Sequence, residues 1–406
     1  MNVPFRPILS ALLRNRAGAI LVALQVAITL AVLVNAVYIV KQRVDLISRP
    51  TGIDVDNIFV VSVTGFTKQF NYEAMLDEDI RWLSSLPGVI AVSAINSVPL
   101  SGGGSSDIVK LTPEAKPSHQ QLVNYFHLNE QGAEALGIKV IAGRWFTRDE
   151  VQAPLPTLFT PYTGPIVVSR DYANKIFPNG DALGKAVYGS DNQPMTIVGI
   201  VDHMLGSWLT GTETPKDIMY MALQPTGSST RYMVRVKPGQ RDQLMRKVEA
   251  EMGARNEMRS VNSVRSLSLF MARSYMTTRN MAIYLVVVTA LLLAITALGI
   301  FALATFNVAT RTKQVGTRRA VGARRRDVVA HFLVENWIIT SGGVLGGSVL
   351  ALAAGYLLSL EYELPRVDLY YIVAGVLAMW VIGVAAAWHP SRRAARISPA
   401  LATRTV

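Results

Sequence analysis

The 406-residue sequence contains no cysteine. Disulfide bridges and cysteine-ligated metal sites are therefore excluded, and any domain outside the cytoplasm must be held together by its packed core alone. The five histidines are His119, His127, His203, His331 and His389. None of them lies at the i,i+4 spacing of a helical zinc site, so we expect no metal centre.

Charge is also scarce, at 17% of residues against the roughly 25% that is usual in soluble domains. The shortage is concentrated in four apolar stretches, 17–40, 281–306, 331–360 and 369–388. Each approaches or exceeds the roughly 20 residues that cross a bilayer. Because lipid offers no partner for backbone amides, such stretches are helical, and the sequence predicts four transmembrane helices.

The first apolar stretch, with Arg14 and Arg16 before it, has one alternative interpretation as a secretory signal peptide. Its apolar run is longer than the core of a usual signal peptide, and it ends in "VYIVKQRV" rather than at a small-residue cleavage site. We therefore interpret it as an anchor that remains in the mature protein.

Basic residues are concentrated beside the apolar stretches. Residues 41–280 carry 25 Lys+Arg and 23 Asp+Glu, whereas the rest of the chain carries 15 and 5. A basic bias that flanks membrane spans follows the positive-inside rule and argues against nucleic-acid binding. The predicted cytoplasmic segments are 1–16, 307–330 and 389–406, and the segments predicted to lie on the outer side of the membrane are 41–280 and 361–368.

The segment 41–280 has the patterning of an α+β domain. Apolar runs at 57–63 and 89–95 flank a helical pattern, which predicts strand, helix and strand. Strand-like runs at 217–223 and 231–237, followed by another helix and strand, repeat this order at the far end. We predict a split βαβ-like part with an inserted subdomain at about 110–212.

Two glycine-containing segments partly resemble nucleotide-binding loops. "GDALGKA" (180–186) has three residues between its glycines, where an ATP-binding loop has four, and Ala186 stands where magnesium needs Ser or Thr. "SVPLSGGGSSD" (97–107) lacks the lysine of a phosphate-binding loop. We interpret the first as a turn and the second as a flexible connector, whose tip could instead be a mobile contact loop. We expect a chain that is not an enzyme and holds no cofactor.

The stretch "RTKQVGTRRAVGARRRDV" (311–328) combines seven basic residues with one acid, between the second and third apolar stretches. A pure topology signal needs only scattered Lys or Arg. An apolar centre with permissive glycines, ringed by positive charge, is typical of a docking surface on a helix–turn–helix. The candidate docking residues are Arg311, Lys313, Gln314, Val315, Gly316, Arg319, Ala320, Val321, Gly322 and Ala323.

Glu335 is the one acid near a span, so it is a candidate intramembrane polar site. The favoured alternative is that it snorkels, or pairs with a base such as Arg324 or Arg326.

Small and polar residues in the spans suggest helix packing. "SGGVLGGS" (341–348) permits close helix approach, and Gln25, Thr29 and Asn35 lie roughly along one side of the first span. Packing within the subunit or across a dimer is the expected role.

Several motifs resemble the FtsX-like and MacB-like ABC transporter permeases. They are the Gly-x-x-x-Ala-Val-Gly-Ala-x-x-x-Asp-Val cadence of the basic loop, "HPSRRAARISPALATR" (389–404) at the end, and "ALGIKVIAGRWFTRDE", "VVSRDYANKIFPNGDALGK" and "IVGIVDHM" in the outer domain. Gln314 replaces the acid common in the family, and Thr317, Arg318 and Arg319 replace apolar residues.

The resemblance implies a multi-pass permease of the bacterial inner membrane. Two permease copies, identical or sister chains, would pair, and each coupling loop would dock onto a separate ABC ATPase that holds ATP and magnesium. The expected work is mechanotransmission to the periplasmic domain for efflux, with an adaptor protein and an outer-membrane channel. Three alternatives stay open. They are the extraction of lipoproteins by a Lol-like permease, the control of a cell-wall hydrolase by an FtsX-like regulator, and ligand sensing by a membrane receptor.

Overall fold

The computed structural model describes residues 16–66, 72–115, 120–155, 160–209, 215–225, 229–362 and 367–397. It divides into two compact units. A membrane unit comprises Met1–Ser48 and Thr278–Val406, and an outer unit comprises Arg49–Thr277. Residues 1–15 of the predicted N-terminal segment 1–16, and residues 398–406 of the predicted tail 389–406, lie outside the described residues.

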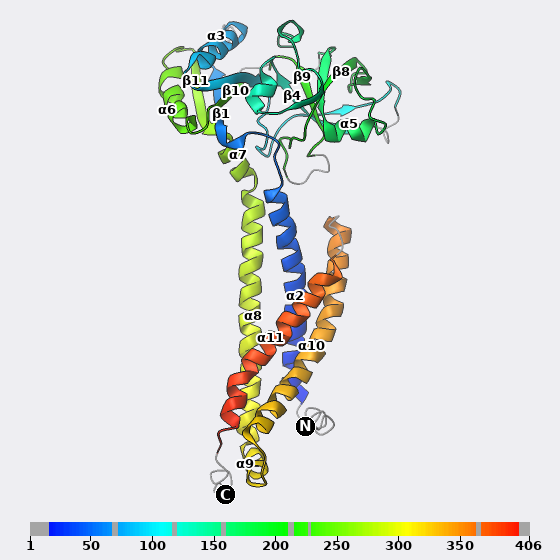
Figure 1. Cartoon of the computed structure of the whole chain (residues 1–406), viewed down its shortest axis with the longest axis vertical. Coiled ribbons are helices and arrows are strands. Elements are labelled where there is room, and N and C mark those ends of the chain that lie inside the picture. The colour runs from blue at the N-terminus through cyan, green and yellow to red at the C-terminus, as the bar shows by residue number, and fades with distance from the viewer. Residues whose placement is uncertain are drawn as a thin grey trace. The chain divides into compact units, whose positions relative to one another are not determined.

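Four long helices form the membrane unit (Figure 1): α2 (Arg16–Ser48), α8 (Met276–Thr310), α10 (Arg325–Tyr362) and α11 (Leu369–Ala394). All four are long and apolar enough to cross a membrane. Each predicted span lies within one of these helices. The polar residues that flank the apolar stretches are also helical, so the helices are longer than the predicted spans. Residues 363–366, half of the predicted loop 361–368, lie outside the described residues, and 361–362 still belong to α10.

Helix α10 packs along α2 through glycines (Figure 1). A Cβ atom added at Gly343 would lie 2.5 Å from the Ala23 carbonyl oxygen, and one at Gly347 would lie 2.7 Å from that of Ala27. Only glycine allows the two backbones to approach this closely. The close packing predicted from the glycine-rich motif therefore occurs within the chain.

Polar side chains of α2 make hydrogen bonds to the neighbouring helices. The hydroxyls of Thr29 and Thr296 lie 2.7 Å apart, which joins α2 to α8. The Asn35 amide donates to the Ala351 carbonyl of α10 at 3.2 Å. These bonds satisfy groups that would otherwise be unpaired in an apolar setting, as the sequence predicts.

Among its described residues, the outer unit contains two sheets. The first has the strand order β11 (Arg259–Ser266), β1 (Ile58–Gly65), β10 (Ser229–Val236) and β2 (Val89–Ile95). All neighbours are antiparallel, so β1 and β2 run in the same direction with β10 between them. Helices α3 (Tyr72–Ser85) and α6 (Arg241–Met252) pack on this sheet, which confirms the split βαβ-like part.

Alternation along β1 places its side chains in two different cores. Phe59, Val61 and Val63 pack with α3 and α6, whereas Ile58 and Val60 pack against the second sheet. A strand that is buried on both faces reads as a continuous apolar run, which explains the sequence "IFVVSV".

The second sheet has seven strands, from β3 (Ser106–Val109) through β4 (Gln121–Leu128), β9 (Ile218–Ala222), β6 (Pro165–Ser169) and β8 (Pro194–Val201) to β5 (Val140–Gly143), with β7 (Ala186–Tyr188) pairing with β8. Short helices α4 (Gly132–Leu136) and α5 (Arg170–Ile176) accompany it.

The predicted insert boundary at about 212 is wrong. Strand β9, which follows it, was expected to belong with β10, but it pairs with β4 and β6 of the second sheet. The five residues of β9 are all buried and show no alternation that would reveal a sheet partner. The inserted subdomain therefore extends from β3 to β9.

The segment "GDALGKA" forms turns, as expected. Gly180 and Gly184 have φ angles of +79° and +76°, which disfavour residues with a side chain. The Lys185 amide donates to the Ala182 carbonyl at 3.2 Å, and the chain then enters β7.

Candidate functional site

The predicted helix–turn–helix between the second and third spans is present. Helix α9 (Thr312–Ala320) follows α8 closely, and α10 begins at Arg325. The Gly322 amide donates to the Arg319 carbonyl at 3.2 Å, and the Ala323 amide donates to that of Arg318 at 3.0 Å. With Gly322 at φ +104°, this is a Schellman-type helix end, which favours glycine because the conformation is left-handed.

One side of α9 faces the chain itself. Val315 and Gly316 are buried, and Val315 belongs to a small apolar cluster. The other buried members of that cluster are Val308, Val328, Phe332, Ala394 and Ala395. Val315 therefore holds α9 against the ends of α8, α10 and α11, and contributes packing rather than exposed docking surface.

The opposite side of α9 and the following turn are exposed. Val321 has 85% of its surface accessible, which is high for a branched apolar side chain. The neighbouring Lys313, Gln314, Ala320 and Gly322 are exposed as well. The structure thus separates the predicted set into a buried anchor and an exposed apolar tip with basic surroundings.

Two arginines fix α9 to the rest of the membrane unit. Arg319 donates through its Nη1 to the carbonyl oxygen of Ile397, just beyond α11. Arg311, directly before α9, donates through Nη1 to Glu335 Oε2 of α10 at 2.9 Å. Both residues were predicted as docking residues, and both are half-buried.

Glu335 is 2% exposed and is paired with Arg311, not with Arg324 or Arg326 as predicted. Arg326 precedes Glu335 by nine residues, which places the two on opposite sides of α10 at about 100° per residue. Arg311 reaches Glu335 because the turn of the chain through α9 returns α10 alongside the end of α8. Among the described residues, Glu335 Oε1 has no hydrogen-bond partner.

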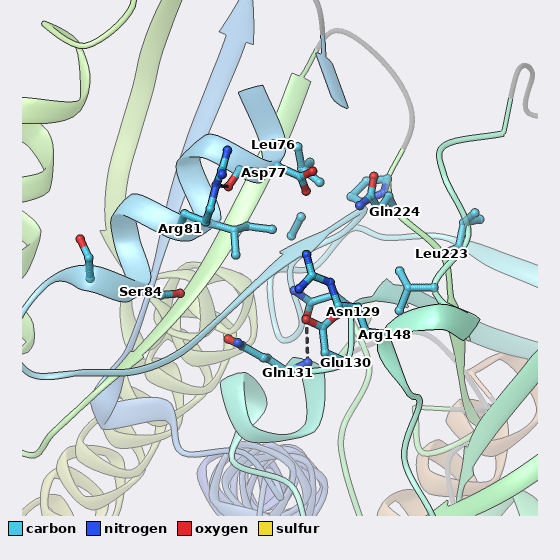
Figure 2. Close-up of a pocket in the computed structure, with 15 residues that line it drawn as sticks. Leu76, Asp77, Arg81, Ser84, Asn129, Glu130, Gln131, Arg148, Leu223 and Gln224 are labelled. Atoms are coloured by element: carbon cyan, nitrogen blue, oxygen red, sulfur yellow. Dashed lines mark hydrogen bonds between the residues drawn. The ribbon is translucent and has the colours of Figure 1, made fainter. Parts of the chain in front are cut away.

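The outer unit has a polar cleft of about 570 Å³ between α3 and the second-sheet subdomain (Figure 2). Asp77 and Arg81 line the α3 side, while Glu130 and Arg148 come from the inserted subdomain. None of these four side chains forms an ion pair among the described residues. The sequence did not indicate this cleft, because its residues come from separate segments.

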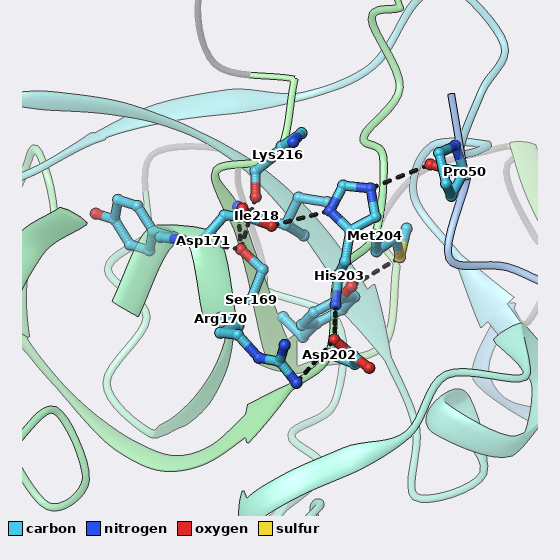
Figure 3. Close-up of polar contacts among 11 residues, drawn as sticks. Pro50, Ser169, Arg170, Asp171, Asp202, His203, Met204, Lys216 and Ile218 are labelled. Atoms are coloured by element: carbon cyan, nitrogen blue, oxygen red, sulfur yellow. Dashed lines mark hydrogen bonds and ion pairs between the residues drawn. The ribbon is translucent and has the colours of Figure 1, made fainter. Parts of the chain in front are cut away.

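The segment that follows α2 is attached to the inserted subdomain. His203 Nε2 lies 3.1 Å from the Pro50 carbonyl oxygen, and His203 Nδ1 lies 2.9 Å from Asp171 Oδ2 (Figure 3). Arg49 donates to the Leu209 carbonyl at 2.6 Å. A Cβ at Gly52 would lie 1.8 Å from the His203 carbonyl oxygen, so this position requires glycine. No pattern in the sequence indicated this role for His203.

Family models match both parts of the chain. The model described as the MacB-like periplasmic core domain matches residues 19–251. The model described as the FtsX-like permease C-terminal region matches residues 286–399, which include α9 and the turn at Gly322.

The curated relatives carry export names. The macrolide export ATP-binding/permease protein MacB of Chromobacterium violaceum is 24% identical over 328 residues, covering 77% of this chain and 48% of that protein. MacB of Bradyrhizobium diazoefficiens is 35% identical over 130 residues, covering 31% and 20%. The chain therefore spans about half, or less, of the length of these relatives.

Among solved structures, the periplasmic region of MacB from Actinobacillus actinomycetemcomitans aligns at 16% identity and a TM-score of 0.33, over 54% of this chain and 92% of that one. The family model of the MacB-like periplasmic core domain by itself matches more than half of the chain, and the FtsX-like model matches the C-terminal part. With four membrane-capable helices and the α+β outer unit in the matching order, the chain belongs to the MacB-like and FtsX-like family of ABC transporter permeases.

Proposed function

We propose that this permease is the membrane subunit of a bacterial inner-membrane exporter, and that an ABC ATPase docks on the exposed tip of α9. The proposal is carried by Val321. An apolar side chain that is 85% exposed, at a turn between basic residues, has the composition of an interface centre and its rim.

The anchors of α9 make it suited to transmit force. The helix is held by the Val315 cluster, by the Arg311–Glu335 ion pair and by the Arg319 hydrogen bond to Ile397. A push at Val321 would therefore move the ends of α8, α10 and α11 together. In this account α2 and α8 carry the movement to the outer unit, since they precede and follow it in the chain.

Export is favoured over the other family roles by the names of the curated relatives, several of which are macrolide export proteins. In this proposal two permeases pair, the outer unit lies in the periplasm, and an adaptor and an outer-membrane channel complete the route. The polar cleft beside α3 would face periplasmic ligands or partners.

The absence of native cysteine allows a direct test of docking. Val321→Cys, co-expressed with its ABC ATPase, is expected to give a crosslinked permease–ATPase adduct with a short bifunctional reagent. Val315→Cys is the matched control, because its side chain is buried on the other side of α9. An ATPase that co-purifies but crosslinks at neither position, or equally at both, would contradict docking through the tip.

A further inference from the structure

A groove of about 510 Å³ runs between α10 and α11 on the surface of the membrane unit. Trp337 of α10 forms one side. The other side is a stripe of α11 residues, three or four positions apart, from Leu377 to Trp388. The stripe extends about 16 Å along the helix, close to the depth of one bilayer leaflet.

The groove contains a concentration of tryptophan. Trp337, Trp380 and Trp388 line it, and they are three of the six tryptophans in the chain. The rings of Trp337 and Trp380 have centroids 5.8 Å apart, and Trp380 donates through Nε1 to the Ser341 hydroxyl at 3.2 Å. These two contacts hold the Trp380 ring in place within the groove. Trp337 and Trp388 remain 40% and 45% exposed.

A guanidinium group lies at the basic end of the groove. Arg392 follows Trp388 by one turn of α11, and its guanidinium carbon lies 5.2 Å from the Trp388 ring centroid. Arg392 is exposed, and among the described residues it has no carboxylate partner within ion-pair distance. The groove thus joins an open apolar surface, about as long as one leaflet is deep, to a positioned positive charge.

We propose that this groove is a binding site for an anionic phospholipid, with one acyl chain along the tryptophans and the phosphate on Arg392. Basic pockets between membrane helices on the cytoplasmic side of the membrane bind anionic lipid headgroups. A second copy of the chain fits less well. Paired copies in the same orientation would bring equivalent arginines together at this end, and like charges oppose such contact.

The distribution of tryptophans permits a fluorescence test on the intact chain. The other three tryptophans, Trp82, Trp145 and Trp208, belong to the outer unit. Bromine on an acyl chain quenches only tryptophans in its immediate vicinity. The chain is reconstituted in bilayers that contain a small fraction of phosphatidylglycerol or of phosphatidylcholine with brominated acyl chains.

The attraction of one arginine to an anionic lipid surface corresponds to about a fivefold difference in affinity. Phosphatidylglycerol is therefore expected to reach half-maximal quenching at about one-fifth of the mole fraction that phosphatidylcholine needs. Arg392→Gln should remove this preference. Arg393→Gln is the matched control, because at 100° per residue it points well away from the stripe, and it should keep the preference.

Three results would overturn the proposal. Equal quenching by both lipids in the wild-type chain means ordinary lipid contact without a headgroup site. No quenching by either lipid means that protein covers the groove, as in a dimer. Equal loss of preference in Arg392→Gln and Arg393→Gln means that the charge acts without a defined position. The first comparison needs no variant, so a misfolded variant does not leave the proposal undecided.

Discussion

The Arg311 guanidinium lies 2.9 Å from the Glu335 carboxylate, and this ion pair joins the end of α8 to α10 across the short helix α9. The Glu335 side chain is 2% exposed and that of Arg311 is 20% exposed. The pair is therefore one of the contacts that hold α9, and with it the exposed tip at Val321, against the membrane helices.

Removing one member of this pair should destabilise the chain more than removing both. Arg311→Gln leaves a buried carboxylate without its partner, and we expect a loss of about 3 kcal/mol in the free energy of unfolding. Arg311→Met combined with Glu335→Leu should lose much less, because no unpaired charge remains. Thermal unfolding in detergent measures both variants, and a double variant that is less stable than Arg311→Gln would contradict this account.

Gly343→Ala should destabilise the membrane unit by about 1–3 kcal/mol, the usual effect of overpacking. Its Cβ would lie 2.5 Å from the Ala23 carbonyl oxygen of α2. The matched control is Gly342→Ala in the same helix, where a Cβ meets nothing within 4 Å. We expect the unfolding midpoint to fall for Gly343→Ala and to stay level or rise slightly for Gly342→Ala. Equal midpoints would show that α2 and α10 do not pack this closely.

Gly52→Ala should loosen the attachment of residues 49–52 to the inserted subdomain. At φ +74° and with a Cβ 1.8 Å from the His203 carbonyl oxygen, alanine is both strained and obstructed. Hydrogen exchange of the peptide that covers residues 49–53 is expected to accelerate. Gly253→Ala, at an open position with φ −64°, is the control and should leave that peptide unchanged. Slow exchange in Gly52→Ala would argue against the attachment through His203.

Acid should weaken one local contact of the outer unit. The hydrogen bonds from Arg144 lower the pKa of Glu150 from 4.5 to about 2. Because the folded-state pKa is depressed, the contribution of Glu150 to stability is full above pH 4.5 and is lost as pH falls towards 2. Urea unfolding at a series of pH values should show wild type and Glu150→Gln converging in stability over this window. A stability difference between wild type and Glu150→Gln that stays constant from pH 5 down to about 2 would contradict this account.

The sequence was sufficient to predict the membrane helices and the outline of the outer unit. Long apolar stretches have few alternative structures in lipid, and the two apolar runs and the helical pattern within 57–95 correspond directly to β1, β2 and α3. Strand β9 was misassigned because a five-residue strand buried on both faces carries no information about its partner.

The candidate site was predicted in composition but not in orientation. The sequence placed Val315 and Val321 in one apolar centre, although the helical turns of α9 send Val315 inward and leave Val321 exposed. The partner of Glu335 was missed because it lies 24 residues away, on a different helix, where sequence spacing gives no guide. The attachment at His203 and the cleft beside α3 depend on tertiary contacts alone.

The measurement that tests the central claim most directly is co-purification of the ABC ATPase with Val321→Asp. An unpaired carboxylate buried in a docking pocket costs several kcal/mol, so we expect capture of the ATPase to be lost while the permease level in the membrane stays normal. Gly322→Val, which disturbs the φ +104° turn, should act in the same direction, and Arg325→Ala should have little effect because an exposed charge contributes about 0–1 kcal/mol. Wild-type recovery of the ATPase with Val321→Asp, or its loss with Arg325→Ala alone, would contradict docking at the tip of α9.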